Sequence, residues 1–420
     1  MQLVAAGGKG GAQIMAQDRW DQARVQGERA GQDMQLGQIE QDQQAERPGC
    51  ERELQTHRGR IAKLQRALEA DGIEAYVISK GSDTRYLTGF TGDYETSVFV
   101  VAPAGCWFVT DSRYEAQAAE EVGELAEVRI YHRWGTEHVS YYTCAGDVLR
   151  ELGVERACYV PEDITVADYN DLAAHAEGVA LEPVEDHVAP LRAIKDAEEI
   201  ETIRQACQIS MRSFYALLDT IRPGVTEYEV ANELERQFRS RGGECSCFET
   251  IVASGPYNGA CPHATVSDRV LEYGDFVTID FGARYHGYCS DITRTVVIGK
   301  AREPELYEYW KIVEEAKEIG ASMLRPAVTY AEVSNAVHAH VNKFGYTIPH
   351  GVGHNFGLDI HEAPFMGPLA DVPEQPGMVH TVEPGIYVPG VGGVRQEDDY
   401  LITEDGCERL TYITDHLIEL

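Results

Sequence analysis

Two stretches rich in β-forming residues carry paired carboxylates that could hold metal ions. In YGDFVTIDFGARYHGYCSDITRTVVIG (273–299), pairing the two β-rich runs about a Tyr285–His286 turn sets Asp280 opposite Asp291 on one face. Directly opposed residues of an antiparallel pair have Cβ atoms about 5 Å apart, so like charges there destabilise the sheet unless a cation lies between them. A pair of metal ions about 3.5 to 4 Å apart suits this spacing.

The alternative is a hairpin on which both aspartates face water. The neighbouring residues argue against it, because they are hydrophobic and indicate a strand that is half buried: Val277, Ile279, Phe281 and Ile292. We therefore expect the two carboxylates on a strand that lies partly in the core.

A second hairpin repeats the arrangement further along the chain. HTVEPGIYV (380–388) and GVRQEDDYLIT (393–403) flank a turn at 389–393, and their pairing brings Glu383 and Glu397 toward one another. Four carboxylates are thus candidate ligands.

Histidines lie between the two hairpins. IPHGVGHNFGLDIHEAP (348–364) holds His350, His354 and His361 among glycines, which let backbone and ligand approach closely. A single histidine is more often a surface or hydrogen-bonded core residue, but three within one short glycine-rich stretch favour a site. Carboxylates with an imidazole suit manganese, cobalt, zinc or iron better than a thiolate site would.

Short strands alternate with helices between residues 55 and 190, which predicts an α/β domain. The strand candidates are AYVIS, SVFVV, CWFVT, VRIY and ACYV, and the helix candidates among and after them are YEAQAAEEVGEL, AGDVLREL and DYNDLAAHA. A helix-like pattern over 191–221 begins a second domain, and another helix over 227–243 ends at paired glycines. The chain then changes to hairpins rich in Gly, Thr and Val, so the domain boundary is placed near residue 190.

The segment 1–54 is predicted to be a disordered, Gln/Gly-rich extension. Residues 1–50 hold eleven Gln and eight Gly with almost no apolar periodicity, a composition that cannot bury enough surface to offset the entropy of ordering. A helical pattern begins near Glu51, so an alternative is that the preceding residues are not part of the natural product. Either way, deleting residues 1–50 is expected to leave activity intact.

The composition of the chain restricts its partners. The 36 Lys and Arg against 69 Asp and Glu give a net charge of −33, which repels phosphate backbones and anionic membranes. No window approaches the ~18 consecutive apolar residues of a membrane span, so we expect neither nucleic acid nor a membrane as partner. The ten scattered cysteines include no CxxC pair, and the first residues lack a secretory h-region, which predicts a cytoplasmic protein with reduced thiols.

The order and spacing of the motifs resemble a known family. IDFGARYHGYCSDITRT, HGVGHNFGLDIHEAP, TVEPGIY and GGVRQEDD resemble core elements of the pita-bread metallopeptidases, and within them the Xaa-Pro aminopeptidases (aminopeptidase P) and Xaa-Pro dipeptidases (prolidases). The resemblance covers about residues 59–420. It implies an α/β creatinase/prolidase-like N-terminal domain over 55–190, followed by an α+β pita-bread catalytic domain over 191–420.

The resemblance also implies a metal centre. The family's five metal ligands fall on Asp280, Asp291, His354, Glu383 and Glu397. Asp280 is then expected to chelate one metal, His354 and Glu383 to hold the other, and Asp291 and Glu397 to bridge the two. Two divalent ions per site are implied, manganese first, with cobalt, zinc or iron as alternatives.

Other family positions imply catalytic and substrate-binding roles. Glu383 is expected to shuttle protons, while His263, His350 and His361 are expected to donate hydrogen bonds to substrate carbonyls and to the developing oxyanion. Arg395 matches a basic position near the site, where it could orient a carboxylate by a bidentate pair.

The implied substrates are peptides with proline at position two. The imide bond before proline lacks an N–H, so its cleavage needs a dedicated site. We expect an aminopeptidase that releases the first residue, because VASGPYNGACPH and the short N-terminal domain resemble small bacterial members so named. An Xaa-Pro dipeptidase is the alternative, and the resemblance also implies a homodimer.

Three rival functions share the fold. Methionine aminopeptidases share the five ligands, but here an N-terminal domain of about 130 residues precedes the catalytic one, and the HxxxH spacing of His350 and His354 resembles proline peptidases. Creatinase-like hydrolases and catalytically silent pita-bread binding proteins lack ligands that are all present here. Asn355, Gln396 and Cys261 depart from the family's usual residues, and these departures bear on specificity more than on chemistry.

Overall fold

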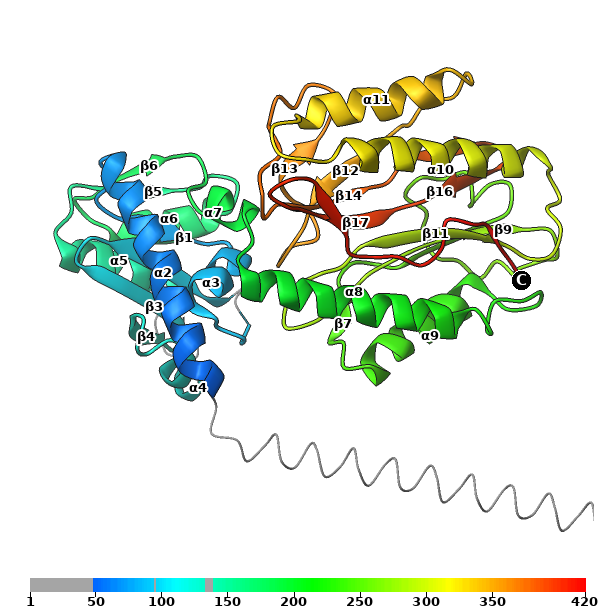
Figure 1. Ribbon diagram of the computed structural model, residues 1–420. Helices are drawn as coiled ribbons and strands as arrows, with labels where there is room; N and C mark the ends of the chain where they lie inside the picture. Colours follow the sequence, from blue (N-terminus) through cyan, green and yellow to red (C-terminus); the bar gives the residue numbers. More distant parts are fainter. Residues whose placement is uncertain (1–47, 94–95, 133–138) are drawn as a thin grey trace, which may run out of the picture. The chain divides into compact units, whose positions relative to one another are not determined.

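The computed structural model describes residues 48–93, 96–132 and 139–420 (Figure 1). Residues 59–420 form one compact unit, and the first residues of helix α2 (Pro48–Ala70), up to Arg58, are assigned to a separate one. The predicted extension up to residue 47 lies outside the described residues. Its predicted last residues, 48–54, are helical instead, because α2 begins at Pro48.

The N-terminal domain is built on a six-stranded mixed sheet with the strand order β4-β3-β2-β1-β5-β6. The sequence-predicted strands and crossover helices are all present, and helix α3 and strand β6 are additional elements. The elements are β1 (Tyr76–Ile78), α3 (Gly81–Thr88), β2 (Val98–Ala102), β3 (Gly105–Asp111), α4 (Glu115–Glu121), β4 (Glu127–Tyr131), α5 (Tyr141–Leu152), β5 (Arg156–Tyr159), α6 (Val166–His175) and β6 (Ala180–Pro183).

Strand β2 shows why this sheet is covered on both faces. Successive side chains of a strand point to opposite faces. Val98 and Val100 pack in a core with residues of α5 and α6, whereas Phe99 and Val101 pack in a second core with residues of α2. A strand buried on both faces reads as a continuous hydrophobic run, as SVFVV does.

The catalytic domain contains two larger sheets, with the orders β19-β11-β9-β8 and β13-β12-β14-β17-β18, and the two-stranded pairs β15-β16 and β10-β7. Its strands are β7 (Cys245–Ser246), β8 (Ile251–Ser254), β9 (Phe276–Phe281), β10 (Ala283–Arg284), β11 (Ile292–Val297), β12 (Gly353–Asn355), β13 (Glu362–Met366), β14 (Val379–Val382), β15 (Gly385–Val388), β16 (Gly392–Arg395), β17 (Asp398–Ile402), β18 (Cys407–Arg409) and β19 (Ile418–Glu419). Its long helices are α8 (Ala197–Leu217), α9 (Glu227–Ser240), α10 (Glu305–Met323) and α11 (Tyr330–Asn342).

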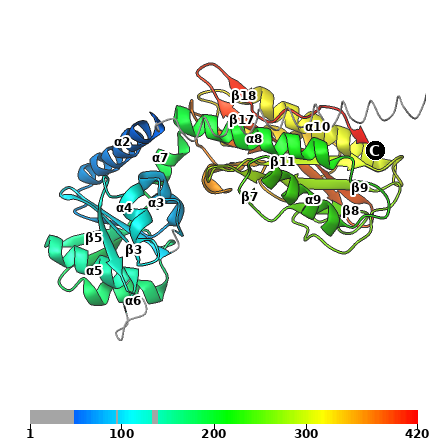
Figure 2. The same cartoon turned by 90° about the horizontal axis from the view of Figure 1, so that it is seen from below.

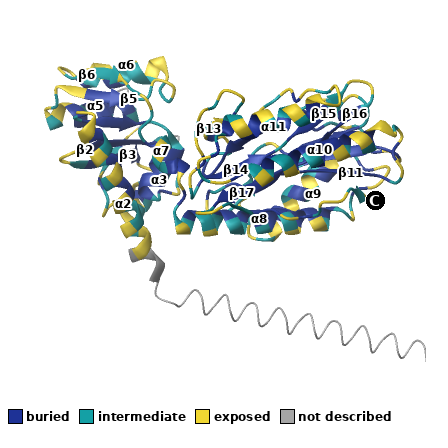
Figure 3. Ribbon diagram, turned by 45° about the horizontal axis from the view of Figure 1, so that its top comes forward, coloured by how far each residue is buried: buried dark blue, intermediate teal, exposed yellow. Residues whose placement is uncertain are grey.

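Each of the two larger sheets of the catalytic domain is covered by one pair of helices (Figures 1 and 2). Helices α8 and α9 share a hydrophobic core with β9 and β11, and α10 and α11 share another with β14, β16 and β17. The outer faces of these helices are exposed while the strands are buried (Figure 3). This is the implied pita-bread arrangement, in which loops and strand ends between the two halves can carry a site.

The helix predicted over 191–221 is in fact two helices. Short helix α7 (Ala189–Ala193) ends before Ile194, and α8 starts after Asp196, whose side chain accepts hydrogen bonds from the N–H groups of Glu198 and Glu199. Such a capping box begins a new helix, and apolar periodicity alone does not reveal it. None of the described helices combines the length and the apolar character needed to cross a membrane.

Candidate active site

The first carboxylate hairpin differs in register from the prediction. Strands β9 and β11 pair with Asp280 opposite Thr293, so the prediction that Asp280 lies directly opposite Asp291 is wrong by two residues. The reason lies in the turn, which centres on His286 and Gly287, both with positive φ, rather than on Tyr285 and His286. Two successive positive φ values define the favoured two-residue hairpin turn. Asp291 is therefore a diagonal neighbour of Asp280 on the same face.

The second hairpin has the register that the sequence predicts. Val382 lies opposite Asp398 in the pairing of β14 with β17, and Gly385 lies opposite Arg395 in the pairing of β15 with β16. Both pairs belong to one continuous register, which places Glu383 opposite Glu397 between them.

His354 joins the two hairpins. It lies on β12, and its Nε2 atom is 3.3 Å from Asp291 Oδ2 and 3.6 Å from Glu383 Oε1. Asp291, His354 and Glu397 each offer one ligand atom, and the three atoms lie within 4.8 Å of one another. Residues far apart in the sequence thus converge on one point.

All the sequence-predicted site residues line a single cavity of about 520 Å³. The chemistry-bearing part of its wall consists of His263, Asp280, Asp291, His350, His354, His361, Glu383, Arg395 and Glu397. An apolar part consists of Phe248, Ile251, Ile360, Phe365 and Met366. The cavity therefore pairs a charged centre with an apolar wall, as binding sites for small organic groups do.

The buried carboxylates repel one another. Burial, followed by the charges of Asp280 and of other nearby carboxylates, raises the pKa of Asp291 well above its usual range. Burial, followed by the charges of Asp291 and Glu383, likewise raises the pKa of Glu397 well above its usual range. Burial raises the pKa of Glu383 to about 7, although His354 and Arg395 act in the opposite direction. A cation within this group would relieve the repulsion.

Arg395 is the one lysine or arginine among the described residues that line the cavity. Its guanidinium donates to Asp280 Oδ2 at 2.6 Å, to the Tyr387 hydroxyl at 2.7 Å, to the carbonyl oxygen of Pro262 at 2.9 Å and to Thr293 Oγ1 at 3.1 Å. Arg395 orients the Asp280 carboxylate through one oxygen only, and its other N–H groups donate to neutral acceptors. The bidentate pair suggested by the sequence is not formed.

The three predicted histidine donors differ in how they are bonded. Both ring nitrogens of His350 are engaged, with Nδ1 at 2.7 Å from the carbonyl oxygen of Gly351 and Nε2 at 3.0 Å from the Tyr387 hydroxyl. Burial lowers its pKa to about 4, so the ring is neutral at physiological pH. Within the described part of the chain, His263 and His361 make no hydrogen bond and remain able to donate.

The donor set fits divalent metal ions. Four carboxylates and one imidazole are the hard and borderline ligands that such ions take in proteins. In addition, Asp280 Oδ1 is buried without a hydrogen-bond partner among the described residues, although buried polar atoms are normally satisfied. The chemistry of the five residues implied as ligands therefore suits divalent ions, and the unpartnered oxygen of Asp280 is free to bind one.

Three further residues support the site and were not singled out in the sequence. Thr293 donates to Glu397 Oε2 at 2.7 Å, Tyr387 bonds both Arg395 and His350, and Asp399 Oδ2 accepts from the N–H of Asp291 at 3.1 Å. All three lie in motifs already quoted, Thr293 in IDFGARYHGYCSDITRT, Tyr387 in TVEPGIY and Asp399 in GGVRQEDD. The position of Thr293 opposite Asp280 follows only from the correct hairpin register.

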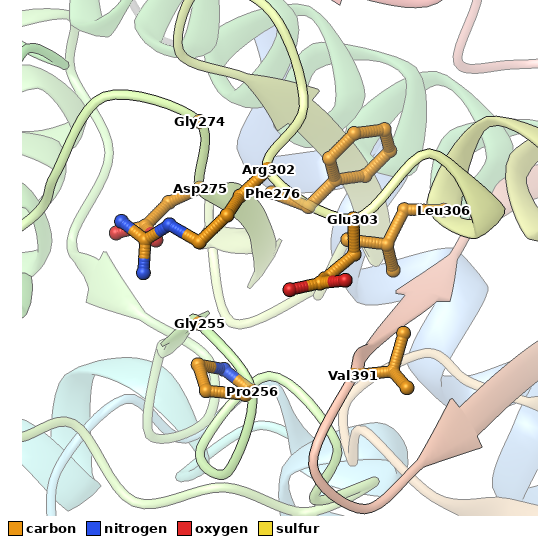
Figure 4. Close-up of a pocket in the computed structure, with 9 residues that line it drawn as sticks. All are labelled: Gly255, Pro256, Gly274, Asp275, Phe276, Arg302, Glu303, Leu306 and Val391. Atoms are coloured by element: carbon orange, nitrogen blue, oxygen red, sulfur yellow. The ribbon is translucent and has the colours of Figure 1, made fainter.

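A second pocket lies elsewhere in the catalytic domain and is too small for a substrate (Figure 4). Its volume of about 20 Å³ accommodates about one water molecule. It is lined by Gly255, Pro256, Gly274, Asp275, Phe276, Arg302, Glu303, Leu306 and Val391, none of which lines the larger cavity.

Comparison with known proteins gives matches over both domains. The model of Metallopeptidase family M24 matches residues 201–404, and that of the Creatinase/Prolidase N-terminal domain matches residues 60–194. An Xaa-Pro dipeptidase of Pyrococcus horikoshii is 31% identical over 86% of this chain and 98% of its own.

Two solved structures are similar along their whole length. The Xaa-Pro dipeptidase from Bacillus anthracis is 36% identical, with a TM-score of 0.80 over 87% of this chain and 100% of its own. The X-Pro aminopeptidase from Thermotoga maritima is 34% identical, with a TM-score of 0.77 over 86% of this chain and 99% of its own.

Proposed function

The chain belongs to metallopeptidase family M24, and we propose that it hydrolyses the bond before proline in Xaa-Pro dipeptides, using two divalent metal ions. The family makes it a metal-dependent hydrolase. One observation carries the proposal: Asp280, Asp291, His354, Glu383 and Glu397 converge on one cavity, where burial and mutual repulsion raise the pKa values of Asp291 and Glu397 well above their usual range. We propose manganese as the metal, with cobalt, zinc or iron as alternatives.

The side chains around the cavity have different proposed roles in the reaction. Divalent ions at such a site supply a water of lowered pKa and polarise a carbonyl oxygen. Glu383, a carboxylate that lines the cavity beside His354, is suited to take a proton from water and pass it to the departing proline nitrogen. His361 and His263 have donors free for the oxyanion and the substrate carbonyl. His350 holds Tyr387 and so acts on the site through Arg395.

The apolar wall fits the proline ring. Phe248, Ile251, Phe365 and Met366 offer a surface without competing hydrogen-bond groups, and the imide nitrogen of the substrate has no N–H that would need an acceptor. An apolar site of this kind favours proline over residues with a free N–H at the same position.

A second candidate function is the release of the first residue from longer peptides, which the sequence analysis favoured. The names of the relatives support the dipeptidase better, since two of the three compared above are Xaa-Pro dipeptidases. One observation favours the aminopeptidase. A dipeptide brings its free carboxylate into the cavity, where Arg395 already serves four acceptors and Glu249 adds negative charge. A longer peptide carries that carboxylate out of the cavity.

Product analysis separates the two candidates. The manganese-loaded protein would be incubated with Ala-Pro and with Ala-Pro-Ala, with and without a chelator. Hydrolysis of Ala-Pro that is lost with the chelator supports the dipeptidase, and release of alanine from the tripeptide alone supports the aminopeptidase. Cleavage of neither peptide contradicts both candidates and favours a binding protein.

The homodimer implied by the resemblance is a separate proposal, which sedimentation at micromolar concentration tests.

A further inference from the structure

Two cations stand at the break between α7 and α8, outside the site. Arg192 belongs to the last turn of α7, and Lys195 follows in the connecting segment; both side chains are almost fully buried. Burying a cation costs free energy unless the cation is paired and hydrogen-bonded. The partners of Arg192 and Lys195 therefore indicate the role of these two side chains.

Arg192 binds carboxylates from two domains. One guanidinium nitrogen, NH1, donates to Asp83 Oδ1 at 2.5 Å and to Ser82 Oγ at 2.8 Å, both on α3 of the N-terminal domain. The other, NH2, donates to Asp359 Oδ2 at 2.9 Å and to Glu362 Oε1, both in the catalytic domain. The planar guanidinium is well suited to hold several carboxylates in fixed directions.

The catalytic-domain partners flank one site residue. Asp359 and Glu362 lie on either side of His361, and Glu362 is its immediate neighbour in the chain. Lys195 Nζ holds the second oxygen of Glu362 at 3.2 Å, and the N–H of Asp359 donates to the first oxygen at 3.2 Å. Glu362 is thereby fixed at both carboxylate oxygens.

The loop that carries His361 is packed tightly against this carboxylate. It connects β12, which bears His354, to β13, which begins at Glu362. A Cβ atom added at Gly357 would lie 2.8 Å from Glu362 Oε1, so the backbone there passes directly over the carboxylate. The rings of His354 and His361 lie 4.4 Å apart at the far end of the loop. A shift of Glu362 would therefore move His361 relative to the candidate metal centre.

We propose that Arg192 is a positioning residue for His361, holding the His361 loop to helix α3 through Glu362, Asp359 and Asp83. The part that His361 plays in hydrolysis rests on the proposed function, whereas the position of its ring does not. Arg192 does not line the cavity, so it reaches His361 only through Asp359 and Glu362.

The kinetic test is a double-mutant cycle with Arg192→Lys and His361→Ala. Arg192→Lys keeps the positive charge but cannot bind several carboxylates at once as the planar guanidinium does. We expect kcat to fall about tenfold or more while KM stays within about twofold, since a misplacement of a catalytic group by about 1 Å can lower the rate up to 100-fold. In the His361→Ala background the same substitution is expected to change kcat less than twofold. An equal fall in both backgrounds would overturn the proposal, as would an unchanged kcat in the single variant.

A matched control separates positioning from general destabilisation. Arg60 is also buried, also links the N-terminal domain to the segment around α8, and pairs with Asp196 and Glu199, but it does not touch the His361 loop. Arg60→Lys is expected to lower thermal stability as Arg192→Lys does while leaving kcat within about twofold. If both variants lose kcat equally, the effect of Arg192 is structural only.

A readout without turnover keeps the inference testable if the proposed function fails. In the zinc-loaded full chain with ¹³C-labelled histidine, the ring signal of His361 is identified by its loss in His361→Ala. Arg192→Lys is expected to shift that signal, and Arg60→Lys is not. An unmoved His361 signal would contradict the proposal whatever the substrate is. Should Arg192→Lys fail to fold, Glu362→Gln breaks the same link from the other side, with the same expected shift.

Discussion

Two consecutive carboxylates, Glu397 and Asp398, are both buried but have opposite surroundings. Asp398 accepts hydrogen bonds from three cations, Arg294 at 2.6 Å, Lys317 at 2.9 Å and Arg409 at 2.6 Å. Burial alone would raise the pKa of Asp398, but these cations hold it below its usual value. Glu397 accepts one bond from the neutral hydroxyl of Thr293, and burial, followed by the charges of Asp291 and Glu383, raises its pKa well above the usual range.

The difference distinguishes a buried carboxylate that stabilises the fold from one that lines the candidate active site. A buried charge is tolerated when the chain pairs it, and Asp398 is paired completely. Glu397 projects to the other side of the strand, into the cavity, where compensation has to come from outside the chain. The charge that folding does not balance therefore marks the place where cations from solution are needed.

The largest effect is expected for Glu397→Gln. The substitution removes a candidate ligand without changing the shape of the side chain, and we expect kcat/KM to fall about a thousandfold, or about 4 kcal/mol. The metal-free protein is expected to gain stability, because one member of a repelling group is neutralised. Denaturant unfolding with and without metal measures the second effect. A loss of stability in the metal-free protein would place Glu397 in the same class as Asp398.

Asp398→Asn is the matched opposite. Removing this charge leaves Arg294 and Lys317 buried without a full counter-charge, so the free energy of unfolding is expected to fall by about 3 to 5 kcal/mol. Urea unfolding of the metal-free protein measures it. An effect under about 1 kcal/mol would show that the cluster does not depend on Asp398.

The pH dependence of the metal-free protein is expected to follow Glu383. Its pKa is raised in the folded state to about 7 from an ordinary 4.5, so the folded chain holds this proton more tightly than the unfolded chain does. Stability should be highest below pH 4.5 for this group and decline by about 3 kcal/mol as pH rises through 7. Bound metal is expected to abolish the decline. A metal-free protein equally stable at pH 5 and pH 8 would contradict the assignment.

A smaller effect is expected for Tyr387→Phe. The hydroxyl accepts from Arg395 and bonds Nε2 of His350, and its loss costs about 1 kcal/mol, or about a fivefold fall in kcat. Tyr215→Phe is a suitable control, because that hydroxyl donates to the carbonyl oxygen of Ile413 away from the cavity. If both variants retain full kcat, Arg395 needs no support from Tyr387.

Much of this arrangement could be predicted from the sequence. The apolar run SVFVV and its companions predict the N-terminal sheet, and the opposition of Glu383 and Glu397 follows from the hairpin about residues 389–393. The four carboxylate candidates came from the predicted hairpins, whereas the full set of five ligands, including His354, came from the resemblance. Their shared cavity was an implication of the resemblance that the structure now supports.

The rest depended on backbone details that residue patterns do not show. The register of Asp280 and Asp291 turned on whether a two-residue turn centres on His286 and Gly287, a shift of one position that moves the pairing by two. The break before α8 depended on the cap at Asp196. The supporting role of Arg192 could not be predicted from the sequence, because its partners lie more than a hundred residues away in both directions along the chain.

The most direct test of the account titrates metal into chelator-stripped protein while metal per chain and hydrolysis of an Xaa-Pro substrate are followed together. We predict that two divalent ions bind per chain, that activity rises with their binding, and that Glu397→Gln reduces both while Asp398→Asn, where folded, retains both. Full hydrolysis in the stripped protein, or metal binding unaffected by Glu397→Gln, would contradict the claim that the uncompensated carboxylates form the metal centre.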